Sequence, residues 1–369
     1  MARTGSIRGV GLTGARPALR APLCPLCRKG SIDFTLTHSA FMIEHAYEQE
    51  VPHMPTPSPV AGWEDVAVRD VETNGITLRV FEQGPGTAGG ADRPLVVLCH
   101  GFPELAFSWR HQVRALAAAG YRVLAPDMRG YGGSSRPDDP DAYDALTLCA
   151  DLAGLLDAEG AQDAVFVGHD WGAIVVWQMA TAYPERVRAV AGMSVPATPR
   201  SPVPPLPLLR KRNGDDFYIV WFQEPGIADR ELARNVRRTL VTREIYSAAW
   251  AARPDEQLPP PRWLNESELA HYVDEFSRTG FTGGLNYYRN LDRTWSLTEH
   301  LAGRTIDCPS LFVTGSKDPV ARFMPDDKME RILTDLRGRV VLDGAGHWIQ
   351  QERPEEVNAA LLDFLAGLD

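Results

Sequence analysis

Cysteine is scarce in this chain, and long apolar runs are missing from it. Its 369 residues include five cysteines, which are too few and too scattered to form a disulfide framework. No apolar run approaches the roughly 18 residues that a membrane-spanning helix needs. We therefore expect a protein without a membrane segment in a reducing compartment, the cytoplasm.

Positive charge is also in short supply. The chain has 38 Lys and Arg residues against 48 Asp and Glu residues, so its formal net charge is −10. A nucleic-acid-binding surface is basic, and this balance therefore argues against one. Because 44% of the residues are hydrophobic, the chain can bury a large core, and we expect a soluble globular protein.

The first sixty residues differ in composition from the rest of the chain. Several basic residues precede the first acidic one, Asp33, and glycine and proline interrupt any periodicity, which predicts a disordered extension over residues 1–60. This segment lacks the apolar core of a secretory signal peptide. Cys24 and Cys27 supply only half of the ligands of a structural zinc site, so we expect no bound metal.

From Trp63 onward, short apolar segments alternate with longer segments that suit helices. The Asn74-Gly75 pair is typical of a tight turn between two hairpin strands. The expected strands cover residues 65–71, 76–82, 95–99, 122–125, 165–167, 189–193, 311–314 and 340–342. This alternation predicts an α/β fold, in which helices flank a mostly parallel central sheet.

Between about residues 196 and 300 the alternation stops. A proline-rich connector, VPATPRSPVPPLPLL, leads into charged and aromatic segments that suit helices. Ligands of open α/β sheets bind outside the carboxyl ends of the strands, so an inserted helical segment would cover the site. We therefore predict a core formed by residues 61–197 and 300–369, with an inserted helical cap over residues 198–299.

The segment VFVGHDWGAIVV places an aspartate, Asp170, between a predicted strand and a predicted helix. Gly168 and Gly172 flank it, and small residues at these positions let strand and helix approach closely around a nucleophile elbow. A hydrolase with such an elbow normally carries serine at its centre. The alternative is an ordinary turn in which the Asp170 side chain caps the following helix.

Further segments that follow predicted strands supply the partners that a nucleophile needs. HGFPE contains Phe102, whose backbone amide would form an oxyanion hole with the amide of Trp171. GSKD contains Asp318 and GAGHW contains His347, which gives the order nucleophile, acid, histidine of an α/β-hydrolase triad. Taken singly, Asp318 could be a turn residue and His347 a core histidine, and Asp343 is a rival for the acid. The glycine-rich loop DMRGYGGSSRP is interpreted as a structural loop that supports its neighbours and takes no part in the chemistry.

Together these motifs resemble the soluble-type epoxide hydrolases of the α/β-hydrolase superfamily. The resemblance runs from about Trp63 to the C-terminus, with HGFPE, GHDWG, GSKD and GHW in the core and DFYIVWFQEPG and NYYRN in the cap. It implies an α/β-hydrolase fold with a cap and a cis bond between Phe102 and Pro103. It also implies two cap tyrosines in the site, Tyr218 and Tyr288.

An aspartate nucleophile suits an epoxide, because a carboxylate is already ionised at neutral pH and needs no base to activate it. Attack by Asp170 would give a covalent ester, which water activated by His347 would hydrolyse while Asp318 orients the imidazole. The resemblance implies that Tyr218 and Tyr288 donate hydrogen bonds or a proton to the epoxide oxygen. We therefore predict an epoxide hydrolase whose partners are a small-molecule epoxide and water, with no cofactor and no metal.

The substrate pocket is expected to be apolar and aromatic, in a monomer or a homodimer. Ile219 stands where the family often has glutamine, which affects the lining more than the chemistry. Tyr287 is adjacent to Tyr288, but the alignment of the motif favours Tyr288. The candidate lining residues are Phe102, Pro103, Trp171, Ile219, Phe222 and Trp348.

Two other functions remain open from the residues alone. A haloalkane or haloacid dehalogenase uses the same aspartate nucleophile, and Trp171 could serve as its halide donor, although two tyrosines suit an oxygen leaving group better. A non-catalytic ligand-binding protein of this fold would have lost a catalytic group, whereas Asp170, Asp318 and His347 are all present. Chloride release would favour the first alternative, and ligand binding without turnover the second.

Overall fold

The computed structural model of the chain describes residues 63–85, 93–242, 246–255 and 257–368. The extension predicted over residues 1–60 and the Cys24 and Cys27 pair therefore lie outside the described residues. Among the described residues, none of the helices has the length and apolar character that crossing a bilayer requires.

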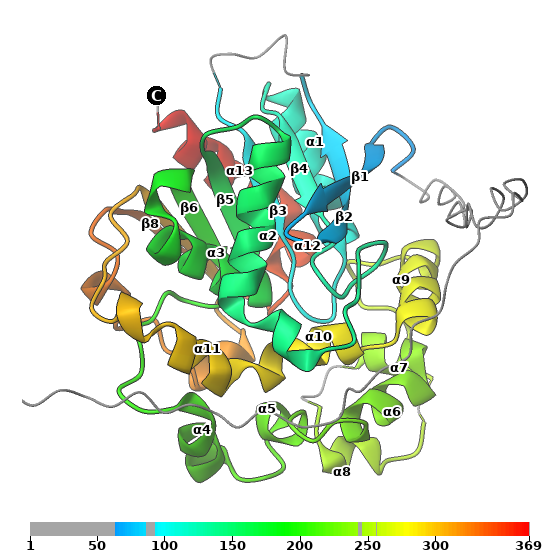
Figure 1. Cartoon of the computed structure of the whole chain (residues 1–369). Helices are drawn as coiled ribbons and strands as arrows, with labels where there is room; N and C mark the ends of the chain where they lie inside the picture. The colour runs from blue at the N-terminus through cyan, green and yellow to red at the C-terminus, as the bar shows by residue number, and fades with distance from the viewer. Residues whose placement is uncertain (1–62, 86–92, 243–245, 256, 369) are drawn as a thin grey trace, which may run out of the picture. The chain divides into compact units, whose positions relative to one another are not determined.

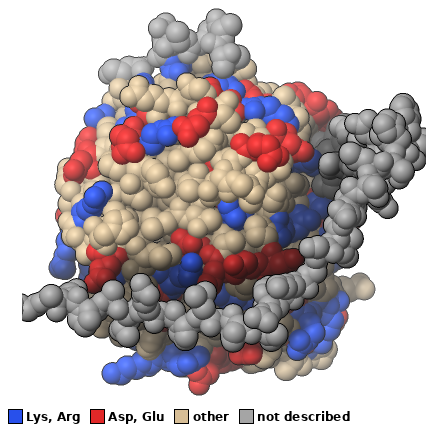
Figure 2. Space-filling view, viewed as in Figure 1, with Lys and Arg blue, Asp and Glu red and all other residues tan. Residues whose placement is uncertain are grey.

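On the face shown in Figure 2, acidic and basic side chains are interspersed.

Within the described part of the chain, an eight-stranded sheet forms the centre of the fold, in the order β1-β2-β4-β3-β5-β6-β7-β8. The β1/β2 and β2/β4 pairs are antiparallel, and all the other neighbours are parallel. The predicted mostly parallel sheet is therefore confirmed. The strands are β1 (Ala67–Thr73), β2 (Ile76–Gln83), β3 (Val96–Cys99), β4 (Val123–Pro126), β5 (Ala164–His169), β6 (Val187–Met193), β7 (Ser310–Gly315) and β8 (Leu336–Leu342).

Burial explains why the strands were recognisable in the sequence. Strands β3, β4, β5 and β7 are buried along their whole length, as expected for parallel strands covered on both faces. The β1/β2 hairpin turns at Asn74 and Gly75, whose φ angles of 45° and 73° fit the tight turn predicted there. Strand β8 begins at Leu336, four residues before the predicted start at 340. The sequence did not indicate this start because the exposed residues of β8 alternate with half-buried ones at the sheet edge, so the strand has no continuous apolar run.

Helices cover both faces of the sheet (Figure 1). Helices α2 and α3 pack together on one face, where α3 contacts β5 and β6, while α1 packs with α13 on the other face. Aspartate at a helix start explains one of these boundaries, since the Asp144 carboxylate accepts hydrogen bonds from the Leu146 and Thr147 amides at the start of α2. These helices are α1 (Arg110–Ala118), α2 (Ala145–Ala158), α3 (Trp171–Ala182), α12 (Ile349–Glu352) and α13 (Pro354–Ala366).

The chain between β6 and β7 is helical throughout its described elements. Figure 1 shows these helices gathered along one side of the sheet, where α10 and α11 lie next to the core. They belong to the same compact unit as the sheet. They are α4 (Pro205–Asn213), α5 (Tyr218–Trp221), α6 (Ile227–Arg234), α7 (Val236–Val241), α8 (Ala248–Ala251), α9 (Glu266–Thr279), α10 (Thr282–Arg289) and α11 (Leu291–Leu297).

Candidate active site

Asp170 lies at a strained turn between β5 and α3. Its backbone has φ 53° and ψ −117°, a conformation that residues with a side chain rarely adopt. A Cβ atom on Gly168 would lie 2.2 Å from the Gly172 carbonyl oxygen, and one on Gly172 would lie 1.9 Å from the Cys99 carbonyl oxygen, so this close approach requires glycine at both positions. The Asp170 side chain makes no capping hydrogen bond to α3. The geometry is therefore that of a nucleophile elbow and not of a capped helix.

The loop after β3 brings Phe102 to the Asp170 carboxylate. The Phe102 amide donates a 2.8 Å hydrogen bond to Asp170 Oδ1. The bond between Phe102 and Pro103 is cis, as predicted. Trp171 is the first residue of α3, immediately after the elbow. Of the two residues predicted for the oxyanion hole, Phe102 thus donates to the Asp170 carboxylate, and Trp171 follows Asp170 directly in the chain.

His347 lies between two carboxylates. Its Nδ1 atom is 2.9 Å from Asp318 Oδ2, and its Nε2 atom is 3.5 Å from Asp170 Oδ2. Asp318 is held in turn by the Val320 amide, which donates to its Oδ1 at 2.8 Å. Asp343 accepts a hydrogen bond from the Ser316 hydroxyl at 3.1 Å and makes no contact with the imidazole. Both predicted contacts of His347 are confirmed, and the acid beside its imidazole is Asp318.

The pKa values of Asp170 and His347 follow from the burial of both groups and from the charges beside them. Burial raises the pKa of Asp170, but the hydrogen bond and charge of His347 outweigh it and bring that pKa below its ordinary value. Burial lowers the pKa of His347, but Asp318 and Asp170 outweigh it and hold that pKa well above its ordinary value. The resting site therefore favours an ionised carboxylate beside an imidazolium.

Two phenols from the helical segment face the same cavity. Tyr218 begins α5 and Tyr288 lies on α10, and their ring centroids are 5.7 Å apart. Burial, reinforced by the Asp170 charge, raises the pKa of both phenols, so both keep their protons at neutral pH. The neighbouring Tyr287 instead donates a 2.8 Å hydrogen bond to the Arg129 carbonyl. Of the two adjacent tyrosines, Tyr288 is thus the one that lines the cavity.

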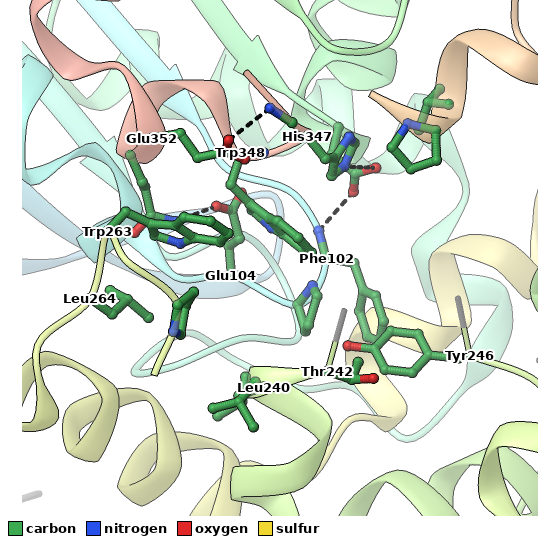
Figure 3. A pocket seen from close by; sticks show the side chains of 18 of the residues that line it. Phe102, Glu104, Leu240, Thr242, Tyr246, Trp263, Leu264, His347, Trp348 and Glu352 are labelled. Carbon is green, nitrogen blue, oxygen red and sulfur yellow. Dashed lines mark hydrogen bonds and ion pairs between the residues drawn. The ribbon is translucent and has the colours of Figure 1, made fainter. Parts of the chain in front are cut away.

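A cavity of about 410 Å³ connects these groups, and aromatic and aliphatic side chains form much of its wall. Figure 3 shows several of them around His347. The lining residues are Phe102, Pro103, Glu104, Asp170, Tyr218, Leu240, Val241, Thr242, Tyr246, Pro261, Trp263, Leu264, Tyr272, Tyr288, Lys317, Pro319, Val320, Phe323, Gly344, Gly346, His347, Trp348, Gln351 and Glu352.

The predicted lining agrees with the structure only in part. Phe102, Pro103 and Trp348 line the cavity, whereas the other three candidates are buried behind its wall. The Phe222 ring packs against the Tyr218 and Tyr288 rings, with centroid distances of 5.6 and 5.1 Å. The residues that do not line the cavity are Trp171, Ile219 and Phe222. Apolar character was a correct guide to burial here, but it cannot distinguish a lining ring from the ring behind it.

A buried polar network behind His347 was not predicted. His169 Nδ1 is 2.7 Å from Glu104 Oε2, and its Nε2 donates to the His347 carbonyl at 2.8 Å. The Ser194 hydroxyl donates to the same carbonyl at 2.7 Å. Burial raises the pKa of Glu104, but the charge of His169 outweighs it and lowers that pKa. The only signal in the sequence was the place of Glu104 and His169 inside the motifs HGFPE and GHDWG.

The glycine-rich loop after β4 has the supporting role predicted for it. Asp127 accepts hydrogen bonds from the amides of Ala106 and Gly133, both at 2.9 Å. The Met128 amide donates to His100 Nε2 at 2.9 Å. These bonds fix the loop after β3 that presents the Phe102 amide. No group of three or more metal-ligating side chains is gathered among the residues that the structure describes.

Comparison with known proteins agrees with this geometry. Residues 94–354 match the alpha/beta hydrolase fold family. The chain is 55% identical to epoxide hydrolase A of Mycobacterium tuberculosis, over 82% of this chain and 98% of that one. It is 39% identical to epoxide hydrolase 3 of Siraitia grosvenorii, over 80% and 96% of the two chains. The crystal structure of epoxide hydrolase A from Mycobacterium thermoresistibile superposes with a TM-score of 0.77 at 53% identity, covering 82% of this chain and 99% of that one.

The fold is that of an α/β-hydrolase, and this part of the prediction is confirmed. Within that class, the chain belongs to the epoxide hydrolase family. It is therefore an enzyme, and the prediction of an epoxide hydrolase from the core and cap motifs is confirmed as well.

Proposed function

We propose that this enzyme hydrolyses an epoxide to a vicinal diol through a covalent ester on Asp170. The observation that carries the proposal is the environment of the Asp170 carboxylate. One of its oxygens accepts the Phe102 amide at 2.8 Å, and the other lies 3.5 Å from His347 Nε2. A carboxylate placed in this way has an oxyanion donor and a base on opposite sides.

In the first step, Asp170 Oδ2 attacks an epoxide carbon and the carbon–oxygen bond of the ring breaks. The electron pair of that bond passes to the epoxide oxygen, which Tyr218 and Tyr288 stabilise by hydrogen bonding and proton donation. Both phenols line the cavity, and their raised pKa values keep them protonated for this task. Asp170 Oδ1 becomes the carbonyl oxygen of the ester and stays on the Phe102 amide.

In the second step, water attacks the ester carbonyl carbon while His347 takes its proton. The ester carries no charge, so one of the two carboxylates that raise the pKa of His347 has been neutralised. The pKa of His347 therefore falls when a base is needed, and Asp318 alone retains the imidazole in position. Collapse of the tetrahedral intermediate breaks the bond between the carbonyl carbon and Oδ2, and the imidazolium of His347 protonates the leaving oxygen to give the diol. The proton of the new carboxylic acid returns to the phenol that gave up its proton in the first step, which restores the Asp170 carboxylate.

Several further features belong to the same proposal. The helical segment of residues 198–299 serves as a cap between core segments 61–197 and 300–369, supported by the tyrosines that it contributes to the cavity. The partners are a small-molecule epoxide and water, and the chain acts as a monomer or a homodimer. A reducing, cytoplasmic location is supported by the free thiols of Cys99, Cys149 and Cys308.

Isotope labelling in a single turnover tests the ester intermediate. With enzyme in excess over the epoxide in oxygen-18 water, the first diol should carry no label, because its new oxygen comes from Asp170. The label should appear instead in the peptide that contains Asp170, as measured by mass spectrometry after digestion. Direct attack by water on the epoxide would label the first diol and leave the peptide unlabelled, which would refute the ester.

The two steps should also differ in their response to acid. The pKa of Asp170 is lowered, so the alkylation rate should stay constant from neutral pH down to the ordinary carboxyl value of 3.8. Hydrolysis of the ester needs a neutral His347, so its rate should fall as the pH falls through the pKa that this imidazole has in the ester. Rapid-quench measurements of the two phases would separate them. An alkylation rate that falls with a midpoint above 3.8 would contradict the assignment of Asp170.

A further inference from the structure

Arg110, at the start of α1, is a buried cation that joins the sheet core to the helical segment. Its side chain is 4% exposed. Its Nε atom donates to Glu268 Oε1 at 2.8 Å, and its Nη2 atom donates to the Trp263 carbonyl at 2.8 Å. Its Nη1 atom donates to Gln351 Oε1 in the core at 2.7 Å. One planar guanidinium thus fixes three separate segments of the chain.

One of the two acceptors in the helical segment, Glu268, is part of a defined local structure. Glu268 also accepts the Asn265 amide at 2.8 Å, which completes the capping box at the start of α9. Arg110 therefore holds the first turn of α9 as well as the segment before it. The guanidinium fork matches these fixed acceptors, and the ammonium group of a lysine cannot reproduce that geometry.

The segment held by Arg110 forms one wall of the cavity. Trp263 and Trp348 stack there, with ring centroids 5.7 Å apart and an interplanar angle of 29°. Figure 3 shows the two rings side by side, with Phe102 and Tyr246 farther along the cavity. Trp263 comes from the helical segment and Trp348 from the core. Their stacking therefore depends on how these two parts of the chain are held together.

We propose that Arg110 is a positioning residue that fixes the wall formed by Trp263 and Trp348. It thereby sets the size of the apolar substituent that an epoxide can carry on that side of the cavity. This inference rests on the proposed function. Gln351 lines the same cavity and also donates to Glu104 Oε1 at 2.9 Å, a bond that does not involve Arg110. The polar network behind His347 therefore keeps its own support when Arg110 is replaced.

Substrates of different size distinguish this role from a general structural one. Arg110→Met removes the bonds to Glu268, Trp263 and Gln351 at similar volume, so the wall loses its fixed position. The KM for stilbene oxide, which carries two phenyl arms, should rise ~10-fold, because a displaced pocket wall discriminates by about this factor. The kcat and KM for propylene oxide, whose single methyl group offers the wall little apolar surface, should stay near the wild-type values.

A matched control and a double variant make the test sharper. Arg114→Met changes another arginine of α1, which pairs with Asp65 at the surface, and both substrates should be unaffected. Trp263→Leu should raise the KM for stilbene oxide by itself. If Arg110 acts through Trp263, then adding Arg110→Met to Trp263→Leu should cause no further rise. Two independent increases would overturn the inference.

Three outcomes can be told apart: misfolding of the Arg110→Met variant, failure of the role assigned to Arg110, and failure of the proposed function. If Arg110→Met does not fold, as judged by circular dichroism, Glu268→Gln removes only the charge of its partner and should raise the KM for stilbene oxide to a smaller extent. An unchanged KM for stilbene oxide, or an equal change for both epoxides, would overturn the role of Arg110. A wild-type enzyme that converts neither epoxide would instead count against the proposed function.

Discussion

The His347→Gln variant is expected to become covalently loaded with substrate. In the proposed mechanism His347 acts only after the ester has formed, so its loss should leave alkylation by Asp170 possible and block hydrolysis. Steady-state turnover should fall about a thousand-fold or more, the upper range for loss of a general base. Intact-protein mass spectrometry should show a gain of one epoxide molecule, and digestion should place that mass on the peptide containing Asp170.

Asp170→Ala provides the matched control, since it keeps His347 and removes the nucleophile. This variant should gain no mass under the same conditions. The competing mechanism is a single step in which His347 activates water against the epoxide and Asp170 only orients the base. It predicts no adduct in either variant. Absence of an adduct in His347→Gln, with binding of the epoxide demonstrated, would therefore refute the two-step mechanism.

The positions of Asp170, Asp318 and His347 could be predicted because each residue lies in a short motif that follows a predicted strand. Asp170 comes immediately after β5, and Asp318 and His347 lie in the loops after β7 and β8. The carboxyl ends of parallel strands meet at one edge of a sheet, so loops far apart in the sequence converge there. The choice of Asp318 over Asp343 needed only the motif GSKD, and the 2.9 Å contact to His347 agrees with it.

Side-chain positions that depend on packing between distant segments could not be predicted in this way. Phe222 is aromatic and close to Tyr218 in the sequence, yet it packs behind the cavity wall while Tyr218 lines it. Trp263 and Arg110 meet across 153 positions of sequence, and neither belongs to a motif that the sequence singled out. Periodicity indicates which side chains are buried, but it contains no information about which distant acceptor a buried cation will find.

The structure also separates the two adjacent tyrosines by the position of their hydroxyl groups. Tyr287 and Tyr288 are consecutive on a helix, so their side chains point in different directions. Tyr287 uses its hydroxyl on the Arg129 carbonyl, and Tyr288 lines the cavity. These two residues therefore form a natural internal comparison for the role of a phenol in ring opening.

Loss of a phenol that lines the cavity is expected to slow the first chemical step. Replacing Tyr288 or Tyr218 by phenylalanine removes one hydroxyl and keeps the ring, so packing against Phe222 is retained. Each single variant should lose about 3 kcal/mol of transition-state stabilisation, which is a factor on the order of a hundred in the alkylation rate. The double variant should lose more, because no donor then remains from the pair to stabilise the epoxide oxygen as the ring opens.

Tyr287→Phe is the control, since it removes a neighbouring hydroxyl that bonds to the Arg129 carbonyl. It should lower the melting temperature, because a buried carbonyl loses its donor, and it should leave the alkylation rate of the folded enzyme near the wild-type value. The rate is measured by mixing excess enzyme with an epoxide and quantifying the ester by mass spectrometry over time. The roles of Tyr218 and Tyr288 would be disproved if all three single variants slowed alkylation equally, because the effect would then come from packing and not from the donated proton.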